Sequence, residues 1–126
     1  MKKIIETKNA PSPIGPYSQA ILINNILYTS GQIAIDPITG KLKTNSIAEE
    51  TQQVMENLKA VLKAADMDFG NVVKTTIYIT NMDDFSKINK VYGSYFNEDT
   101  APARETVQVA KLPKLVHVEI SVMAYL

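Results

Sequence analysis

The chain has 126 residues and no cysteine, and its 13 basic and 13 acidic side chains leave no formal net charge. This length predicts one domain, residues 1–126, large enough to bury a hydrophobic core. With balanced charges, the chain lacks the excess of basic residues that a nucleic-acid-binding protein needs. Without cysteine, it can form neither disulfides nor thiolate nucleophiles. No apolar run approaches about 20 residues, and the N-terminal residues do not have the pattern of a signal peptide. We therefore expect a cytoplasmic protein without a nucleic-acid or membrane partner.

The N-terminal third predicts an ordered loop followed by a β-hairpin. Residues 9–18 hold three of the six prolines, which excludes a regular helix or a central strand there. Two runs rich in β-forming residues then flank Asn24 and Asn25, a pair that tolerates positive φ and so predicts a hairpin. Residues 36–41 (DPITGK) predict a second turn.

From Ser46 onward, helical and strand patterns alternate. Ser46 and Glu49 fit a capping box, and apolar residues continue at helical spacing to near Met67. Residues 71–80 alternate as a strand with Val73, Thr75, Ile77 and Ile79 on one face, and 83–96 return to helical spacing. Two further strands are expected at about 104–110 and 115–125. This order predicts an α+β fold, one mixed sheet with two helices on one face.

Two helices leave the other face of the sheet uncovered. The hairpin at 20–30 is apolar on both of its faces, which suggests that a partner chain covers what the helices do not. We therefore expect a homo-oligomer, with a monomer that exposes a solvated sheet face as the alternative. The expected polar residues of this face are Lys74, Thr76, Tyr78, Arg104, Thr106, Gln108, His117, Glu119 and Ser121.

Arg104, the only arginine, is the first candidate for chemistry. Its planar fork of donors binds a carboxylate through two parallel hydrogen bonds, which lysine cannot match. If the last two strands pair as antiparallel neighbours, Arg104 and Glu119 lie on the same surface within reach of each other. Glu119, partly shielded from water, could then orient or deprotonate a water molecule. A purely structural ion pair is the alternative.

Other candidate residues are weaker. His117 is the only histidine, and its surroundings lack the spacing of a zinc motif, so we expect it at a surface or an interface. Tyr17 presents a phenol from a rigid loop, and Ser30 and Gly31 end a strand where a ligand can approach backbone N–H groups. No nucleophile elbow, P-loop, dinucleotide fingerprint or metal-binding spacing appears, so no cofactor or metal is expected.

The order and spacing of six segments resemble the RidA (YjgF) family over essentially the whole chain. They are APSPIGPYSQA, YTSGQIAIDPITG, VVKTTIYITNMDDF, VYGSYF, APAR and VQVAKLPKLVHVEI. The arginine after "PA" is similar to that of the 2-iminobutanoate/2-iminopropanoate deaminases within this family. The resemblance implies a chorismate-mutase-like fold that forms homotrimers with clefts between neighbouring subunits.

The resemblance also implies roles for individual residues. Arg104 would bind the substrate carboxylate, and Glu119 would position water and transfer protons. The remaining substrate-binding positions that match the family are Tyr17, Ser30, Gly31, Asn89 and Thr106. The implied reaction is hydrolysis of 2-imino acids, the tautomers of 2-aminoacrylate and 2-aminocrotonate, to 2-keto acids and ammonia, with no cofactor. This reaction protects pyridoxal-phosphate enzymes from damage.

The chain departs from the family at two places. The segment PARETVQV replaces the common PARSCVEV, and Ser121 removes the second carboxylate of the EIE motif. Both departures leave the preferred imino acid open. The alternative function is a regulatory module that binds a keto or imino acid without turnover. A ribonuclease activity, a name also attached to the family, is disfavoured by the zero net charge and the single histidine.

Overall fold

The computed structural model describes all residues, 1–126, and contains six strands, two α-helices and four short 3-10 turns. The strands are β1 (Lys3–Ile5), β2 (Ala20–Ile23), β3 (Ile26–Thr29), β4 (Val72–Ile79), β5 (Ala103–Gln108) and β6 (Val118–Tyr125). The helices are α1 (Ile47–Ala64) and α2 (Phe85–Gly93), and the turns are η1 (Phe69–Asn71), η2 (Met82–Asp84), η3 (Glu98–Thr100) and η4 (Pro113–Leu115).

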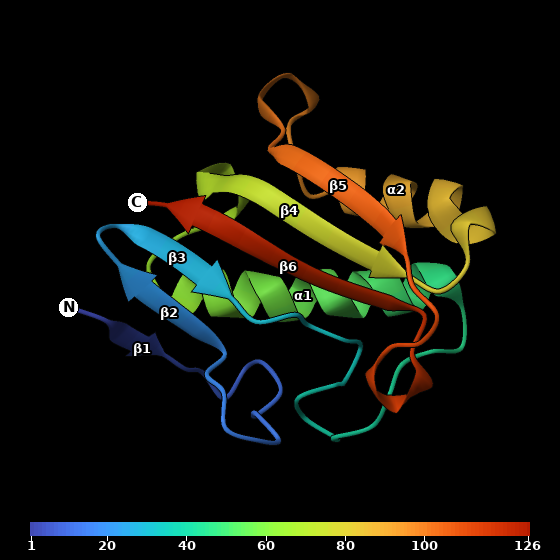
Figure 1. The fold of residues 1–126 in the computed structure, drawn as a ribbon, viewed down its shortest axis with the longest axis horizontal. Coiled ribbons are helices and arrows are strands. Elements are labelled where there is room, and N and C mark those ends of the chain that lie inside the picture. The colour runs from blue at the N-terminus through green and yellow to red at the C-terminus, as the bar shows by residue number, and fades with distance from the viewer.

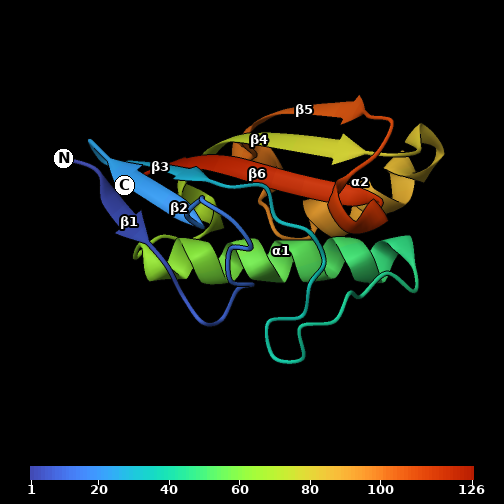
Figure 2. The same cartoon turned by 60° about the horizontal axis from the view of Figure 1, so that its bottom comes forward.

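All six strands form one sheet in the order β1-β2-β3-β6-β4-β5. Only the β4–β5 pair is parallel, so the sheet is mixed. Both helices lie against one face, and the other face carries no element of this chain (Figures 1 and 2). The predicted architecture of one mixed sheet with two helices on one face is therefore confirmed. Neither helix is long and apolar enough to cross a membrane.

The two-residue turn and the first helix form for the reasons that the sequence indicates. Asn24 and Asn25 adopt φ of 50° and 66°, as a tight hairpin between β2 and β3 requires. Ser46 is the N-cap of α1, and its side chain accepts a hydrogen bond from the Glu49 N–H at 3.1 Å. The apolar stripe of α1 packs under the sheet to form the centre of the core, whose fully buried members include Val54, Met55, Leu58, Val61 and Leu62.

Two local expectations are corrected at the sheet. Val73 does not share the buried face of β4, because an irregularity in the β4–β6 register between Val72 and Lys74 exchanges the two positions. Val72 is 5% exposed and Val73 is 50% exposed. The short strand β1, which has no pattern of its own, adds to the edge of the sheet beside β2.

The neighbour of β5 also differs from the expectation. The β5 strand does not pair with β6 but lies parallel to β4 at the edge of the sheet, with Thr75 opposite Arg104. The parallel connection passes through α2, a crossover that places the helix against the face on which Thr75 is buried. As a result Arg104, Thr106 and Gln108 lie on the helix face, whereas Glu105 and Val107 face the open side.

Candidate functional site

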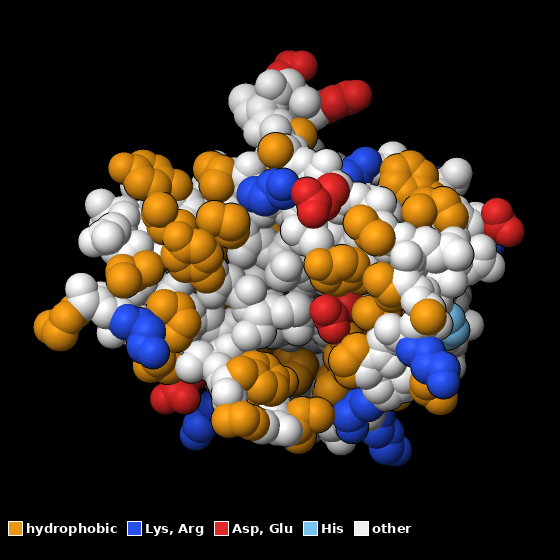
Figure 3. Space-filling view, in the orientation of Figure 1, with side chains coloured by type: hydrophobic (Ala, Val, Ile, Leu, Met, Phe, Trp, Pro, Cys, Tyr) orange, Lys and Arg blue, Asp and Glu red, His pale blue; other side chains and the backbone are white.

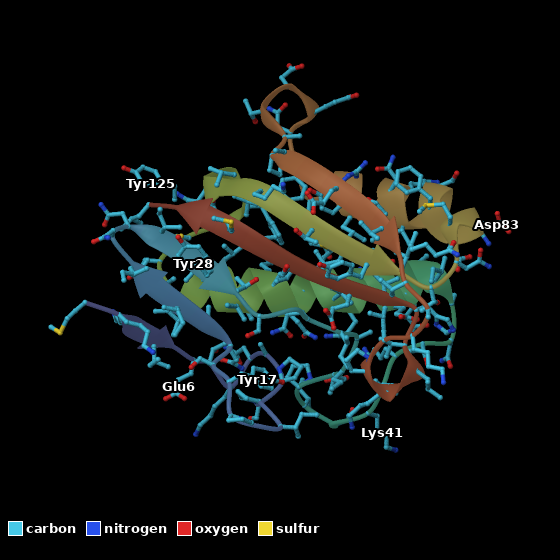
Figure 4. All side chains as sticks on the ribbon, in the orientation of Figure 1. Glu6, Tyr17, Tyr28, Lys41, Asp83 and Tyr125 are labelled. Atoms are coloured by element: carbon cyan, nitrogen blue, oxygen red, sulfur yellow. The ribbon has the colours of Figure 1, made fainter.

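A cavity of about 450 Å³ opens beyond the end of β3. Figure 3 shows the open face as a largely uncharged surface with a hollow bordered by hydrophobic side chains, and Figure 4 places Tyr17 on the loop beyond β2 and β3. Glu119 of β6 is the only charged residue in the wall. The wall also contains Pro11, Ser12, Ile14, Tyr17, Ser30, Gly31, Gln32, Ile33, Ile35 and Pro113. Four predicted residues (Tyr17, Ser30, Gly31 and Glu119) thus meet in one cavity.

The buried side chain of Gln19 holds the proline-rich wall of this cavity. Its carbonyl oxygen accepts the Thr7 N–H at 2.7 Å, and its amide donates to the carbonyls of Thr7, Ala10 and Pro11 at 3.0, 3.2 and 2.8 Å. A loop rich in proline lacks regular hydrogen bonding, so these bonds replace it. The loop therefore presents Tyr17 from a fixed backbone, and the expectation of an ordered loop is confirmed.

Ser30 and Gly31 play different parts at the end of β3. The Ser30 hydroxyl donates to the Ser18 carbonyl at 2.5 Å, so it ties the proline-rich loop to β3 and keeps only acceptor capacity for a ligand. Gly31 lies directly under the Glu119 carboxyl group. A Cβ added at Gly31 would lie 2.6 Å from Glu119 Oε2, so glycine is the residue that fits here.

Burial raises the pKa of the Glu119 carboxyl group above its ordinary value. No cation lines the cavity to oppose this effect. A carboxyl group with a raised pKa next to an apolar wall is suited to exchange protons with a bound molecule.

Arg104 lies in a second cavity, of about 430 Å³, between the edge strand β5 and α2. Its Nη1 donates to Asn89 Oδ1 at 2.6 Å, and its guanidinium carbon lies 5.0 Å from the centre of the Tyr92 ring and 5.5 Å from that of Phe85. These contacts hold the planar fork while leaving the side chain exposed for a ligand. The predicted residues Asn89 and Arg104 are thus in direct contact.

Thr106 follows Arg104 on the same face of β5, two residues further along the strand. Its hydroxyl oxygen is buried and has no hydrogen-bond partner within the chain. Buried polar atoms are rarely left without a partner. The hydrogen bonding of Thr106, a predicted site residue, is therefore incomplete in the single chain.

The chain does not bring the two cavities together. Arg104 is opposite Thr75, and Glu119 is opposite Tyr78, on the two sides of β4. Three residues along β4 and two strand spacings separate their Cα atoms by about 14 Å, and the two side chains point to opposite faces. The expectation that Arg104 and Glu119 share one surface of the chain is therefore wrong, because β4 lies between their strands.

His117 and Glu50 form a polar group outside both cavities. His117 has a half-exposed side chain, and its Nδ1 lies 2.8 Å from Oε1 of the fully buried Glu50 in α1. The sequence analysis missed Glu50, although it follows Ile47 by three residues and precedes Val54 by four, the spacing of the buried helix face. No three His, Asp or Glu side chains gather as metal ligands do.

The architecture places the chain in a class of α+β proteins in which two helices cover one face of a single sheet. Within this class the sequence identifies the family, since the family described as endoribonuclease L-PSP matches residues 7–126. The chain belongs to this family, the RidA/YjgF family that its motifs resemble, and the prediction of the family is confirmed.

Named relatives and a solved structure match nearly the full chain. A RutC family protein of Pyrococcus horikoshii, PH0854, is 51% identical over 99% of this chain and 98% of its own length. The human 2-iminobutanoate/2-iminopropanoate deaminase is 45% identical over 98% of this chain and 90% of its own. AldR of Lactococcus lactis, named as a regulator, is 48% identical over 97% and 96%. The Rid-family protein YyfA of Yersinia pestis superposes with a TM-score of 0.97 at 53% identity, covering both chains completely.

Proposed function

We propose that this protein hydrolyses small 2-imino acids to 2-keto acids and ammonia. The iminium carbon gains the oxygen of water, the C=N bond breaks, and nitrogen leaves as ammonia with the protons that water supplies. The proposal rests on deaminase-named relatives at 45–48% identity and on the chemistry of the two cavities. One cavity holds a carboxyl group with a raised pKa, and the other holds a guanidinium group that binds carboxylates.

The observation that carries the proposal is the division of these groups between opposite faces of the sheet. A small imino acid that touches both Arg104 and Glu119 needs Arg104 from one subunit and Glu119 from the next. Joining one face of a chain to the opposite face of its neighbour is a heterologous contact, and such contacts form a ring when the rotation between neighbours closes. We therefore propose a ring with its sites between subunits, and the resemblance to the RidA family implies that this ring is a homotrimer with three sites.

The open face supports this assembly by its exposed apolar side chains. Tyr28, Val107 and Tyr125 lie on it and are 42%, 43% and 56% exposed. Figure 4 shows Tyr28 and Tyr125 at the end of the sheet away from Tyr17. Exposed apolar groups spread over an uncovered sheet are typical of a surface that a partner chain buries.

In the assembled site Arg104 would hold the substrate carboxylate through its fork, which sets the position of the neighbouring iminium carbon. Glu119 of the adjacent subunit would accept a proton from the attacking water and return it to the departing nitrogen. Tyr17 would close the cavity, and the backbone beside Gly31 would approach the substrate closely. The apolar wall would exclude bulk water from the short substrate side chain.

Ammonia release from 2-aminoacrylate, generated in the assay by a dehydratase, tests the proposal. Wild-type protein should accelerate it, and Arg104→Ala should lower kcat/KM by about thirtyfold or more, the effect of removing one partner of a buried charged pair. The control is Lys90→Ala, which removes a cation from α2 outside the Arg104 cavity. Equal turnover by wild type and Arg104→Ala would contradict the assignment.

A second candidate is a regulatory module that binds the same acids without turnover, which the name of the AldR relative favours. Arg104 would serve both functions, because each requires a carboxylate to be held. Binding of 2-oxobutanoate that depends on Arg104, together with no ammonia release above the uncatalysed rate, would select this candidate.

A further inference from the structure

Glu50 is a carboxylate without solvent access at the first turn of α1. Its Oε2 accepts the backbone N–H groups of His117 and Val118 at 2.7 and 2.9 Å, and its Oε1 lies 2.8 Å from His117 Nδ1. All three contacts are with Val118, the first residue of β6, and with His117 directly before it. A buried carboxylate is costly unless its oxygens are paired, and here each oxygen has a partner.

The carboxylate takes the place of a missing strand. On its β3 side, β6 pairs with β3 only at residues 123–125, and a single bridge joins Gln32 to Ile120. Beyond that bridge the chain after β3 turns away, so Val118 has no strand partner on this side. Glu50 supplies the acceptor that the neighbouring strand would otherwise provide.

Glu119 is the residue between these two attachments. On one side Glu50 fixes His117 and Val118, and on the other the Gln32 bridge fixes Ile120 through bonds of 2.8 and 3.1 Å. Immediately before the Glu50 contacts, Lys114 and Leu115 both have φ of 56°, a conformation unfavourable for side chains of their size. Without Glu50, a strained turn would adjoin a strand start that is attached on its β4 side alone, through the pairing of Val118 with Ile79 and the bond from the Thr80 N–H to the His117 carbonyl.

We propose that Glu50 is a positioning residue, which fixes the start of β6 so that the Glu119 carboxylate lies over Gly31 in the cavity. The proposal rests on the deaminase function proposed above, and it assigns Glu50 no contact with the substrate. The carboxyl group of Glu119 lies in the space that a Cβ of residue 31 would occupy, so its place over Gly31 depends on how the backbones of these two residues are positioned. A displacement of about 1 Å at a reacting group can lower a rate by as much as about a hundredfold.

Glu50→Ala, Glu50→Gln and a control, Thr51→Val, test the proposal at a temperature where all three variants are folded. Thr51 is also fully buried, but its hydroxyl bonds only to Ile47 within the helix. Glu50→Ala should lower kcat on 2-aminoacrylate at least about tenfold with KM nearly unchanged, since Arg104 still holds the carboxylate. Glu50→Gln should restore most of kcat, because its amide oxygen accepts both backbone N–H groups. Thr51→Val should match wild type.

A purely stabilising role for Glu50 predicts a different result. The unfolding temperature would fall, but kcat below that temperature would not, and this would overturn the proposal. Equal loss of kcat in Glu50→Gln and Glu50→Ala would overturn it as well, because the charge of Glu50 rather than its hydrogen bonds would then matter.

A second measurement does not depend on the deaminase activity. Titration of the ¹³C-labelled Glu119 carboxyl group by NMR should show an altered midpoint in Glu50→Ala and the wild-type midpoint in Thr51→Val. An unaltered midpoint in Glu50→Ala would overturn the positioning role. If wild type releases no ammonia while the midpoint still moves, the proposed function fails and the structural role of Glu50 stands.

Discussion

Gly31 leaves free the space that the Glu119 carboxyl group occupies in the wall of the cavity. The Cβ position of Gly31 lies 2.6 Å from the carboxyl oxygen and 2.7 Å from the carboxyl carbon of Glu119. These distances are shorter than van der Waals contact, so a larger residue 31 moves the carboxyl group. The glycine therefore sets the location of the proposed proton-transfer group.

Gly31→Ala should lower kcat/KM for imine hydrolysis by about tenfold or more, because it pushes the Glu119 carboxyl group out of position. The unfolding temperature should change little, since the displaced atoms, Cγ and the carboxyl group of Glu119, belong to a flexible side chain at a partly open site. Steady-state ammonia release and thermal unfolding, measured side by side, check both expectations.

A double-mutant cycle provides the control for this prediction. In Glu119→Ala the atoms that obstruct the new Cβ are absent, so adding Gly31→Ala should cause no further loss of activity. If the two losses multiply instead, Gly31→Ala acts through the backbone or a substrate contact, and the assignment of Gly31 as a spacer for Glu119 is wrong.

At the scale of elements, the turn η4 before β6 carries the largest conformational strain in the chain. Lys114 and Leu115 both adopt φ of 56°, and Leu115 is 74% exposed. A left-handed conformation costs an ordinary side chain about 1 kcal/mol, and an exposed leucine regains nothing by burial in the single chain. Asparagine tolerates this conformation much better.

Leu115→Asn should therefore stabilise the protein by about 1 kcal/mol, which raises the unfolding temperature by about 4 °C. Differential scanning calorimetry measures this shift, and Leu42→Asn, an exposed leucine outside the regular elements without positive φ, serves as the matched control. A lower unfolding temperature for Leu115→Asn would contradict this prediction.

The elements themselves follow from local patterns that the sequence displays. The helical spacing after Ser46, the Asn24–Asn25 turn and the alternation in β4 each depend on residues close together in the chain, and each element forms where it was predicted. Their details differ, because α1 ends at Ala64 rather than near Met67 and Val73 leaves the predicted face of β4. The strand order does not follow from such patterns. Both β5 and β6 alternate in a similar way, and nothing local indicates that β4 lies between them.

The candidate site, like the fold, was predictable where it depends on local motifs and not where it depends on long-range pairing. The motifs name seven site residues, and the structure places four of them, Tyr17, Ser30, Gly31 and Glu119, around one cavity. The position of Arg104 depends on the long-range pairing of β5 with β4, and the buried Glu50 depends on which helix turn meets β6. Both positions depend on tertiary contacts, so sequence patterns alone could not predict them.

At the scale of the whole molecule, the proposed active site consists of two halves, the Arg104 cavity and the Glu119 cavity, which would come from different subunits. This division suggests an experiment on mixed subunits. Arg104→Ala chains keep an intact Glu119 half, and Glu119→Gln chains keep an intact Arg104 half. Each variant alone should be nearly inactive in imine hydrolysis. In a mixed ring, a site is complete wherever the Glu119 half of the first variant meets the Arg104 half of the second.

Co-expression of the two variants in equal amounts should recover about one quarter of the wild-type activity, the chance that a random pair of neighbours has the right order. The matched control is a mixture of Arg104→Ala with Asn89→Ala. Asn89 binds the Arg104 guanidinium within the same chain, so both variants damage the same half and no mixed site is complete. Ammonia release from the purified mixed species distinguishes the two mixtures. If the first mixture is no more active than its separate components, the site does not lie between subunits and the proposed assembly is wrong.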